Sequence, residues 1–109
     1  MSDWVTVCDE SDLIPGTGIC ALLGVEQVAV FKTRKDNTVY AISNYDPIGK
    51  ANVLSRGITG SIGDDIVVAS PLYKQHFNLA TGVCLEDSEQ SVKAYSVRVE
   101  AGKIQLKSN

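Results

Sequence analysis

The sequence has little of what most catalytic and metal centres require. Its 109 residues contain one histidine, His76, and three cysteines, Cys8, Cys20 and Cys84, none of which form a CxxC pair. An odd number of widely spaced cysteines does not predict a disulfide framework, and one histidine with scattered cysteines does not make a zinc motif. We therefore expect three small, buried thiols in a reduced compartment.

Excess positive charge and long apolar runs are also missing. Ten Lys and Arg against thirteen Asp and Glu give a net charge of −3, which argues against a nucleic-acid partner because phosphate binding needs a clustered positive surface. No segment is long and apolar enough to span a bilayer. The opening MSDWVTVCDE has neither a basic nor an apolar signal region. We expect a cytoplasmic protein that does not bind membranes.

No catalytic constellation is visible either. A second histidine for acid–base work and a Ser-His-Asp arrangement are both absent. The glycines of GITGSIG lack the strand–helix context of a phosphate-binding loop. The sequence therefore predicts no catalysis by this chain alone.

What the chain does have is a series of short strand patterns. Apolar residues alternate or form β-branched runs with turns every eight to twelve residues, which indicates an all-β antiparallel sandwich or small barrel in a single domain, 1–109. The expected strands cover residues 4–8, 18–24, 27–33, 38–43, 65–70, 75–79, 95–100 and 103–107.

Three connecting segments carry further signals. Asp9 or Ser11 can cap one short helical turn before Pro15, and Ala101-Gly102 predicts a tight hairpin between the last two strands. Residues 44–63 contain four glycines and a proline without long periodicity. A loop of this length inside a compact domain is typically functional, although short strands can interrupt it.

Three segments together resemble the Rieske iron–sulfur family: AISNYDPIGKANVL, VVASPLYKQHFNLATG and KAYSVRVEAGKIQL. In that family a Cys-x-His loop and a Cys-x-x-His loop hold a [2Fe–2S] cluster, and a Tyr-x-Val-x-Val hairpin ends the domain. The match runs from about Tyr40 to Leu106. It implies a Rieske-like fold whose two ligand loops form a subdomain over about residues 44–80.

The resemblance places other residues where the family has its ligands. Asp46 and Ser70 stand at the cysteine positions, Ile48 and Tyr73 at the histidine positions, and Lys74 where a glycine is expected. Isoleucine cannot ligate, hard oxygen donors suit a cluster poorly, and a tyrosine would have to lose a proton with a pKa near 10. We expect no cluster and no other metal or cofactor on this chain.

Without a cluster the loops need another means of support. We expect Ile48 to fill the vacated space and Tyr73 to stack over it, with the tyrosine hydroxyl reaching a backbone carbonyl or Asp46. His76 lies three residues beyond Tyr73 and is expected to be a surface or strand-edge imidazole. Four basic side chains in or near the loops form a candidate partner interface: Lys50, Arg56, Lys74 and His76.

Over its whole length the chain is similar to one cluster-less group, the small subunits of the bacterial NAD(P)H-dependent nitrite reductases. The similarity is carried by IPGTGICALLG, ASPLYKQHFNL and GVCLEDSEQSVKAYSVRVE, among other stretches. It implies a large catalytic subunit as partner, with FAD, a [4Fe–4S] cluster and sirohaem, that reduces nitrite to ammonia. Two alternatives remain open here: a Rieske-type ferredoxin with unusual ligands, and a small-ligand or metal-binding module around Asp46, Ser70 and Tyr73.

Overall fold

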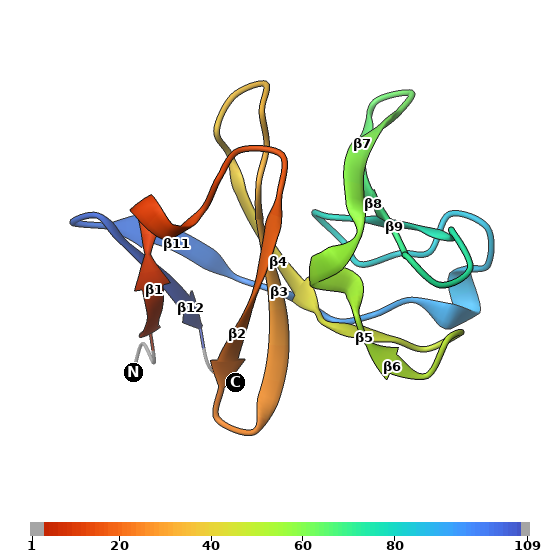
Figure 1. The fold of residues 1–109 in the computed structure, drawn as a ribbon, viewed down its shortest axis with the longest axis horizontal. Helices are drawn as coiled ribbons and strands as arrows, with labels where there is room; N and C mark the ends of the chain where they lie inside the picture. Colours follow the sequence, from red (N-terminus) through yellow and green to blue (C-terminus); the bar gives the residue numbers. More distant parts are fainter. Residues whose placement is uncertain (1–3, 108–109) are drawn as a thin grey trace.

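The computed structural model describes residues 4–107, so residues 1–3 and 108–109 of the predicted 1–109 domain lie outside it (Figure 1). The described chain is all-β, and its helical segments are single 3-10 turns at Glu10–Asp12 (η1), Leu54–Arg56 (η2) and Ser88–Gln90 (η3). None of the helical segments among these residues is long or apolar enough to cross a membrane. The strands are β1 (Trp4–Asp9), β2 (Gly18–Leu23), β3 (Glu26–Lys32), β4 (Val39–Ser43), β5 (Tyr45–Asp46), β6 (Ala51–Asn52), β7 (Ile58–Ile62), β8 (Asp65–Ala69), β9 (His76–Asn78), β10 (Ala94–Tyr95), β11 (Val97–Glu100) and β12 (Lys103–Lys107).

The strands pair only in antiparallel fashion and form four sheets. Their orders are β1-β12-β11, β10-β4-β3-β2, β5-β6 and β7-β8-β9. The expected all-β antiparallel class is confirmed. Of the two architectures considered, the barrel is not formed, because the pairings within residues 4–107 leave these sheets separate. Figure 1 shows the β7-β8-β9 and β5-β6 sheets on one side of the central β2-β3-β4 ribbon, and the β1-β12-β11 sheet on the other.

Strand β3 divides the two hydrophobic cores. Its four consecutive residues Val28, Ala29, Val30 and Phe31 are all fully buried, as a continuous apolar run predicts for a strand covered on both faces. Because successive side chains alternate, Val28 and Val30 pack in one core and Ala29 and Phe31 in the other. The core that contains Val28 also holds Leu13, Ala21, Leu23, Ala41, Tyr95, Ile104 and Leu106.

The second core supports the loop region. Around Phe31 and Ile42 it gathers Leu54 from η2, Val68 from β8 and Phe77 from β9, each fully buried. Full burial of a side chain of this size contributes roughly 1.5–3 kcal/mol. The two loops that join β5 to β6 and β8 to β9 are thereby anchored on a packed base.

The expected turns are present. A 3-10 turn follows Asp9, whose backbone N–H donates to Asp12 Oδ2 at 3.2 Å. Ala101 and Gly102 both have positive φ, 52° and 78°, and close the β11–β12 hairpin between the paired residues Glu100 and Lys103. This is the turn geometry that matches the right-handed twist of the strands.

The prediction of three buried cysteines is met in full only by Cys84. Cys84 is buried and Cys8 is half-buried, but Cys20 is exposed. On β2 the side chains of Ile19, Ala21 and Leu23 face the core, so Cys20, which lies between Ile19 and Ala21, points to the other face.

Gly82 ends the segment that follows β9 and has a backbone requirement that can be tested. It has φ of 80°, and a Cβ built on it would lie 2.0 Å from the carbonyl oxygen of Val92. Gly63 has φ of 60° but open space around its Cβ position. Gly63→Ala should therefore lower the free energy of unfolding by about 1–2 kcal/mol, the cost of the left-handed conformation alone. Gly82→Ala should lower it by the same amount and by about 1–3 kcal/mol more, because the added Cβ overpacks the site.

Urea unfolding of the two variants and the wild type measures both losses. Equal destabilisation by the two substitutions would contradict the close approach of Gly82 to Val92.

Candidate functional site: two loops without cluster ligands

The two loops have the same local structure. One is Asp46–Lys50 (DPIGK) and the other Ser70–Lys74 (SPLYK), and each has proline second and lysine fifth. In each, the side-chain oxygen of the first residue accepts a hydrogen bond from the N–H of the third, and its carbonyl accepts one from the N–H of the fifth. The fifth residue is left-handed, with φ of 57° at Lys50 and 68° at Lys74. That conformation explains why a glycine is expected at the position of Lys74.

A buried hydrogen bond joins the loops at their first residues. The Ser70 hydroxyl donates to Asp46 Oδ2, and both residues have no exposed surface. The other carboxylate oxygen, Oδ1, accepts from the backbone N–H groups of Ile48 at 2.9 Å and Gly49 at 3.0 Å. A carboxylate can be buried when its oxygens accept hydrogen bonds in this way. The two side chains that stand where the family has its cysteine ligands are therefore hydrogen-bonded directly to each other.

Packing of the third residue of the second loop against the fourth residue of the first loop reinforces the hydrogen bond between the loops. A Cβ built on Gly49 would lie 2.3 Å from Cδ1 of Leu72, so the glycine lets the leucine close over the first loop. Ile48 is half-buried and packs against the core around Phe77. Ile48, which was expected to fill space beneath the loops, is thus only partly enclosed.

The expectation for Tyr73 is wrong. Its side chain is 64% exposed, which is too open for stacking within a plug. Asp46 instead takes its hydrogen bonds from Ser70 and from two backbone N–H groups. With its own carbonyl bonded to Lys74 N–H, Ser70 is held at the base of the loop while Tyr73 projects from the tip.

These side chains do not fit a [2Fe–2S] centre of the Rieske kind. Such a centre needs two thiolates on one iron and two imidazoles on the other, and the corresponding positions hold a carboxylate, a hydroxyl, an aliphatic chain and an exposed phenol. Among residues 4–107 no three His, Cys, Asp or Glu side chains gather as a metal site. Of the three residues considered for a ligand pocket, Asp46 and Ser70 are fully enclosed and bonded to each other, and only Tyr73 is exposed.

His76 lies at the start of β9, the outermost named strand of its sheet, whose other side pairs with residues 83–85. Its Nδ1 is 2.6 Å from Glu86 Oε2, and its backbone N–H donates to Glu86 Oε1 at 2.8 Å. These backbone and side-chain hydrogen bonds lower the pKa of Glu86 below its ordinary value. Glu86 was not singled out by the sequence, because ten residues separate the pair and no local pattern joins them.

The basic residues of the candidate interface are placed as follows. Lys50 and Lys74 are exposed at the tips of the two linked loops. Arg56 is exposed at the end of η2, next to Gly57, whose Cβ position lies 2.3 Å from the carbonyl oxygen of Ala69 on β8. None of these three cations has a carboxylate within 4.0 Å among the described residues.

Beside the loops is a pocket of about 440 Å³ that the sequence did not predict. Gln75 contributes a buried side-chain oxygen that accepts no hydrogen bond from residues 4–107. A buried acceptor left unpaired costs about 1–3 kcal/mol. The residues around the pocket are Pro47, Ile48, Lys50, Gln75, Glu86, Asp87 and Gln90.

Comparisons with known proteins agree with this arrangement. The family model of the Rieske-like [2Fe-2S] domain matches residues 3–107. The nitrite reductase (NADH) small subunit of Salmonella typhimurium is 50% identical over 107 residues, covering 98% of this chain and 99% of the relative. The NMR structure of the Escherichia coli protein NirD has a TM-score of 0.91 at 48% identity, covering 100% of this chain and 99% of that one.

A third relative is built differently. The nitrite reductase [NAD(P)H] large subunit of Klebsiella oxytoca is 44% identical over 101 residues, which are 93% of this chain but 10% of that relative. In that protein a segment similar to nearly the whole of this chain is part of the large subunit itself.

The fold and the two loops define a Rieske-like domain that lacks the family's ligand residues. Within that class, the 50% sequence identity to a nitrite reductase small subunit over nearly the full length of both chains shows the narrower family. The chain belongs to the Rieske-like [2Fe-2S] domain family and, inside it, to the family of nitrite reductase small subunits.

The Ser70–Asp46 hydrogen bond should carry measurable stability. Ser70→Ala leaves a buried carboxylate oxygen without its donor, so we expect the free energy of unfolding to fall by about 1–3 kcal/mol. Ser96→Ala, which truncates an exposed serine, should change it by less than about 0.5 kcal/mol. Urea titration of both variants makes the measurement.

A double-mutant cycle with Asp46→Asn isolates the pairwise energy. Additive losses from Ser70→Ala and Asp46→Asn would show that the two loops are not coupled through this bond.

Proposed function

We propose that this chain is an accessory subunit of a cytoplasmic NAD(P)H-dependent nitrite reductase and carries no electrons itself. The observation that supports this most is the replacement of the cluster ligands by a buried Ser70–Asp46 hydrogen bond. A residue pair that satisfies itself in this way has no free donor for iron. The chain acts as a subunit of an oxidoreductase, and the chemistry takes place on its partner.

The partner in this proposal is the large catalytic subunit. Support comes from the Klebsiella oxytoca relative, in which a similar segment belongs to the large-subunit chain. Fusion places the two parts at a fixed ratio and a high effective concentration, which suits parts that work together. FAD, [4Fe–4S] and sirohaem are proposed for the large subunit, where electrons from NAD(P)H reduce nitrite to ammonia for nitrogen assimilation.

The proposed docking surface is the loop face, formed by Lys50, Arg56, Lys74 and His76. Two supports are that none of the first three cations has a carboxylate of the described residues within 4.0 Å, and that Leu72 and Tyr73 of the second loop are exposed, by 44% and 64%. Exposed apolar and aromatic side chains ringed by charge are typical of interface centres.

The unpaired Gln75 oxygen adds a third support. It lies in the pocket beside Lys50, where a hydrogen-bond donor from the partner would satisfy it. Glu86 and Asp87 line the same pocket, so a basic side chain of the partner suits it best.

Spectroscopy tests the non-redox role. The purified chain should show no visible absorption and contain no stoichiometric iron, because its donors cannot hold a cluster. A variant with Asp46→Cys, Ile48→His, Ser70→Cys and Tyr73→His restores the family's ligand types and should take up iron on reconstitution. This variant is the positive control for the assay.

If the wild-type chain binds iron and shows a Rieske-type spectrum after the same reconstitution, the chain is an electron carrier instead. That result would favour the ferredoxin alternative.

Charge reversal tests the docking surface. Arg56→Glu with Lys74→Glu should weaken binding to the large subunit by about tenfold or more, because like charges then face the partner. Lys35→Glu with Lys107→Glu makes the same change in net charge away from the loops and should have little effect. Co-purification and titration of the two subunits give the comparison.

Equal binding by the loop variant and the control variant would argue against this surface. The activity of the large subunit with and without the small one, measured in parallel, shows whether docking is required for turnover.

A further inference from the structure

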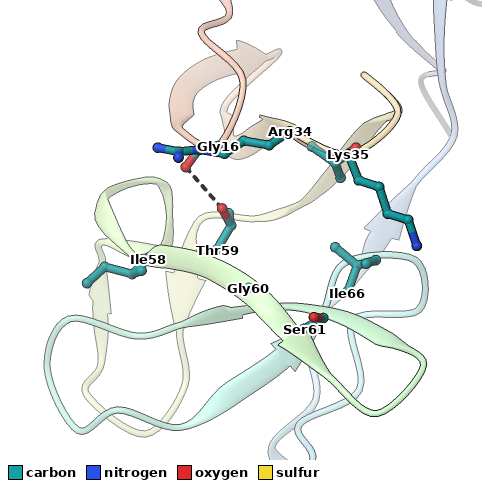
Figure 2. A pocket seen from close by; sticks show the side chains of 9 residues that line it. Gly16, Arg34, Lys35, Ile58, Thr59, Gly60, Ser61 and Ile66 are labelled. Atoms are coloured by element: carbon teal, nitrogen blue, oxygen red, sulfur yellow. Dashed lines mark hydrogen bonds between the residues drawn. The ribbon is translucent and has the colours of Figure 1, made fainter.

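A second pocket lies away from the loops, between the two parts of the fold. One wall is the β7–β8 hairpin, with Thr59, Ser61 and Ile66, and the other includes the turn after β3, with Arg34 and Lys35. Its volume is about 460 Å³, within the range of small-molecule sites. Figure 2 shows the hydrogen bond from the Thr59 hydroxyl to the carbonyl of Gly16, 3.0 Å long, which crosses between the walls.

The charge of this cleft is unbalanced. Neither Arg34 nor Lys35 has a carboxylate within 4.0 Å among the described residues, whereas Lys32, on the adjoining strand, pairs with Glu10 at 3.5 Å. The adjacent Asp36 keeps its charge, but its Oδ1 accepts from the Thr33 hydroxyl and the Thr38 N–H, and it forms no ion pair with either cation. Two cations without an ion-pair partner at one pocket favour an anionic ligand.

The placement of the two cations limits the shape of that ligand. Figure 2 shows the side chains of Arg34 and Lys35 extending in opposite directions along the cleft, with Thr59 lying between them. Next to Lys35, Ile66 provides apolar surface, and Gly60 leaves the floor open because no atom lies within 4 Å of its Cβ position. An anionic group at each end and an apolar middle would match these features.

We propose that this cleft binds an elongated organic dianion, with one anionic group held by the Arg34 guanidinium and the other by the Lys35 ammonium. The carbon skeleton lies over Ile66 and the exposed Ile58, and the Ser61 hydroxyl supplies a further polar contact. The ligand carries two anionic groups, either phosphate or carboxylate, on one carbon skeleton. This inference does not depend on the proposed role at the loop face.

A series of α,ω-dicarboxylates of increasing chain length tests the spacing between the two cations. NMR titration of the purified chain with glutarate, pimelate and azelate should give an affinity that passes through a maximum with chain length, because only one length reaches both cations. Hexanoate, with one carboxylate, should bind at least tenfold more weakly than the best dicarboxylate. Fructose 1,6-bisphosphate and inorganic phosphate form the phosphate arm and show which anionic group is preferred.

Two single variants make the assignment specific. Arg34→Gln and Lys35→Gln should each lower the affinity for the best dianion to that of the monoanion, whereas Lys107→Gln, which removes an equal charge from β12, should leave it unchanged. Ser61→Asp, a substitution at an exposed position, should abolish binding by charge repulsion within a folded chain.

The proposal is overturned if no ligand of either arm saturates below about 1 mM, the weak end of specific binding. It is also overturned if affinity is independent of length, or if Lys107→Gln weakens binding as much as the cleft variants. Docking to the large subunit is measured separately, so a negative result here leaves the loop-face proposal intact.

Discussion

The hydrogen bond between Ser70 and Asp46 is the constraint on which the loop region depends, because it joins two loops at the positions where the family's thiolates would share an iron. A charged hydrogen bond of this kind contributes roughly 1.5–3 kcal/mol. That is far below the roughly 10–16 kcal/mol typical of a structural zinc site in small peptides. One bond cannot replace a metal, so the bond fixes how the two loops meet, and the core beneath, where Leu54, Phe77 and Leu79 are buried, anchors each loop.

The loops also hold their shape locally. In each, a side-chain oxygen, a proline and an i to i+4 backbone bond fix the turn before the loops meet. Lys50 and Lys74 then occupy left-handed conformations, which cost a non-glycine residue roughly 1–2 kcal/mol. Glycine would avoid that cost. Lysine rather than glycine at both tips is accounted for by the proposed contact of these charges with a partner, and not by the backbone conformation.

Most strands and turns were predictable because they depend on local patterns such as the apolar run of β3 and Ala101-Gly102. Strand β7 was missed because it lies in the glycine-rich stretch 44–63, and the predicted strand 95–100 is divided between β10 and β11 in two sheets. The resemblance located Asp46 and Ser70 but did not predict their bond, since 24 residues separate them and no local pattern indicates which side chains a fold brings together. Cys20 was misplaced for a different reason. Both faces of GICALLG carry apolar residues, so alternation alone could not decide which face is buried.

The distribution of charge explains how one small domain can present two separate surfaces. Lys32 on β3, Lys93 just before β10 and Lys103 on β12 are each paired with a carboxylate. The cations left without one among residues 4–107 include Arg34 and Lys35 in the cleft, and Lys50, Arg56 and Lys74 at or near the loops. The chain therefore has two local positive regions although its net charge is −3. Because exposed charges are screened beyond about 10 Å at ordinary salt, each region acts mainly on the groups that contact it.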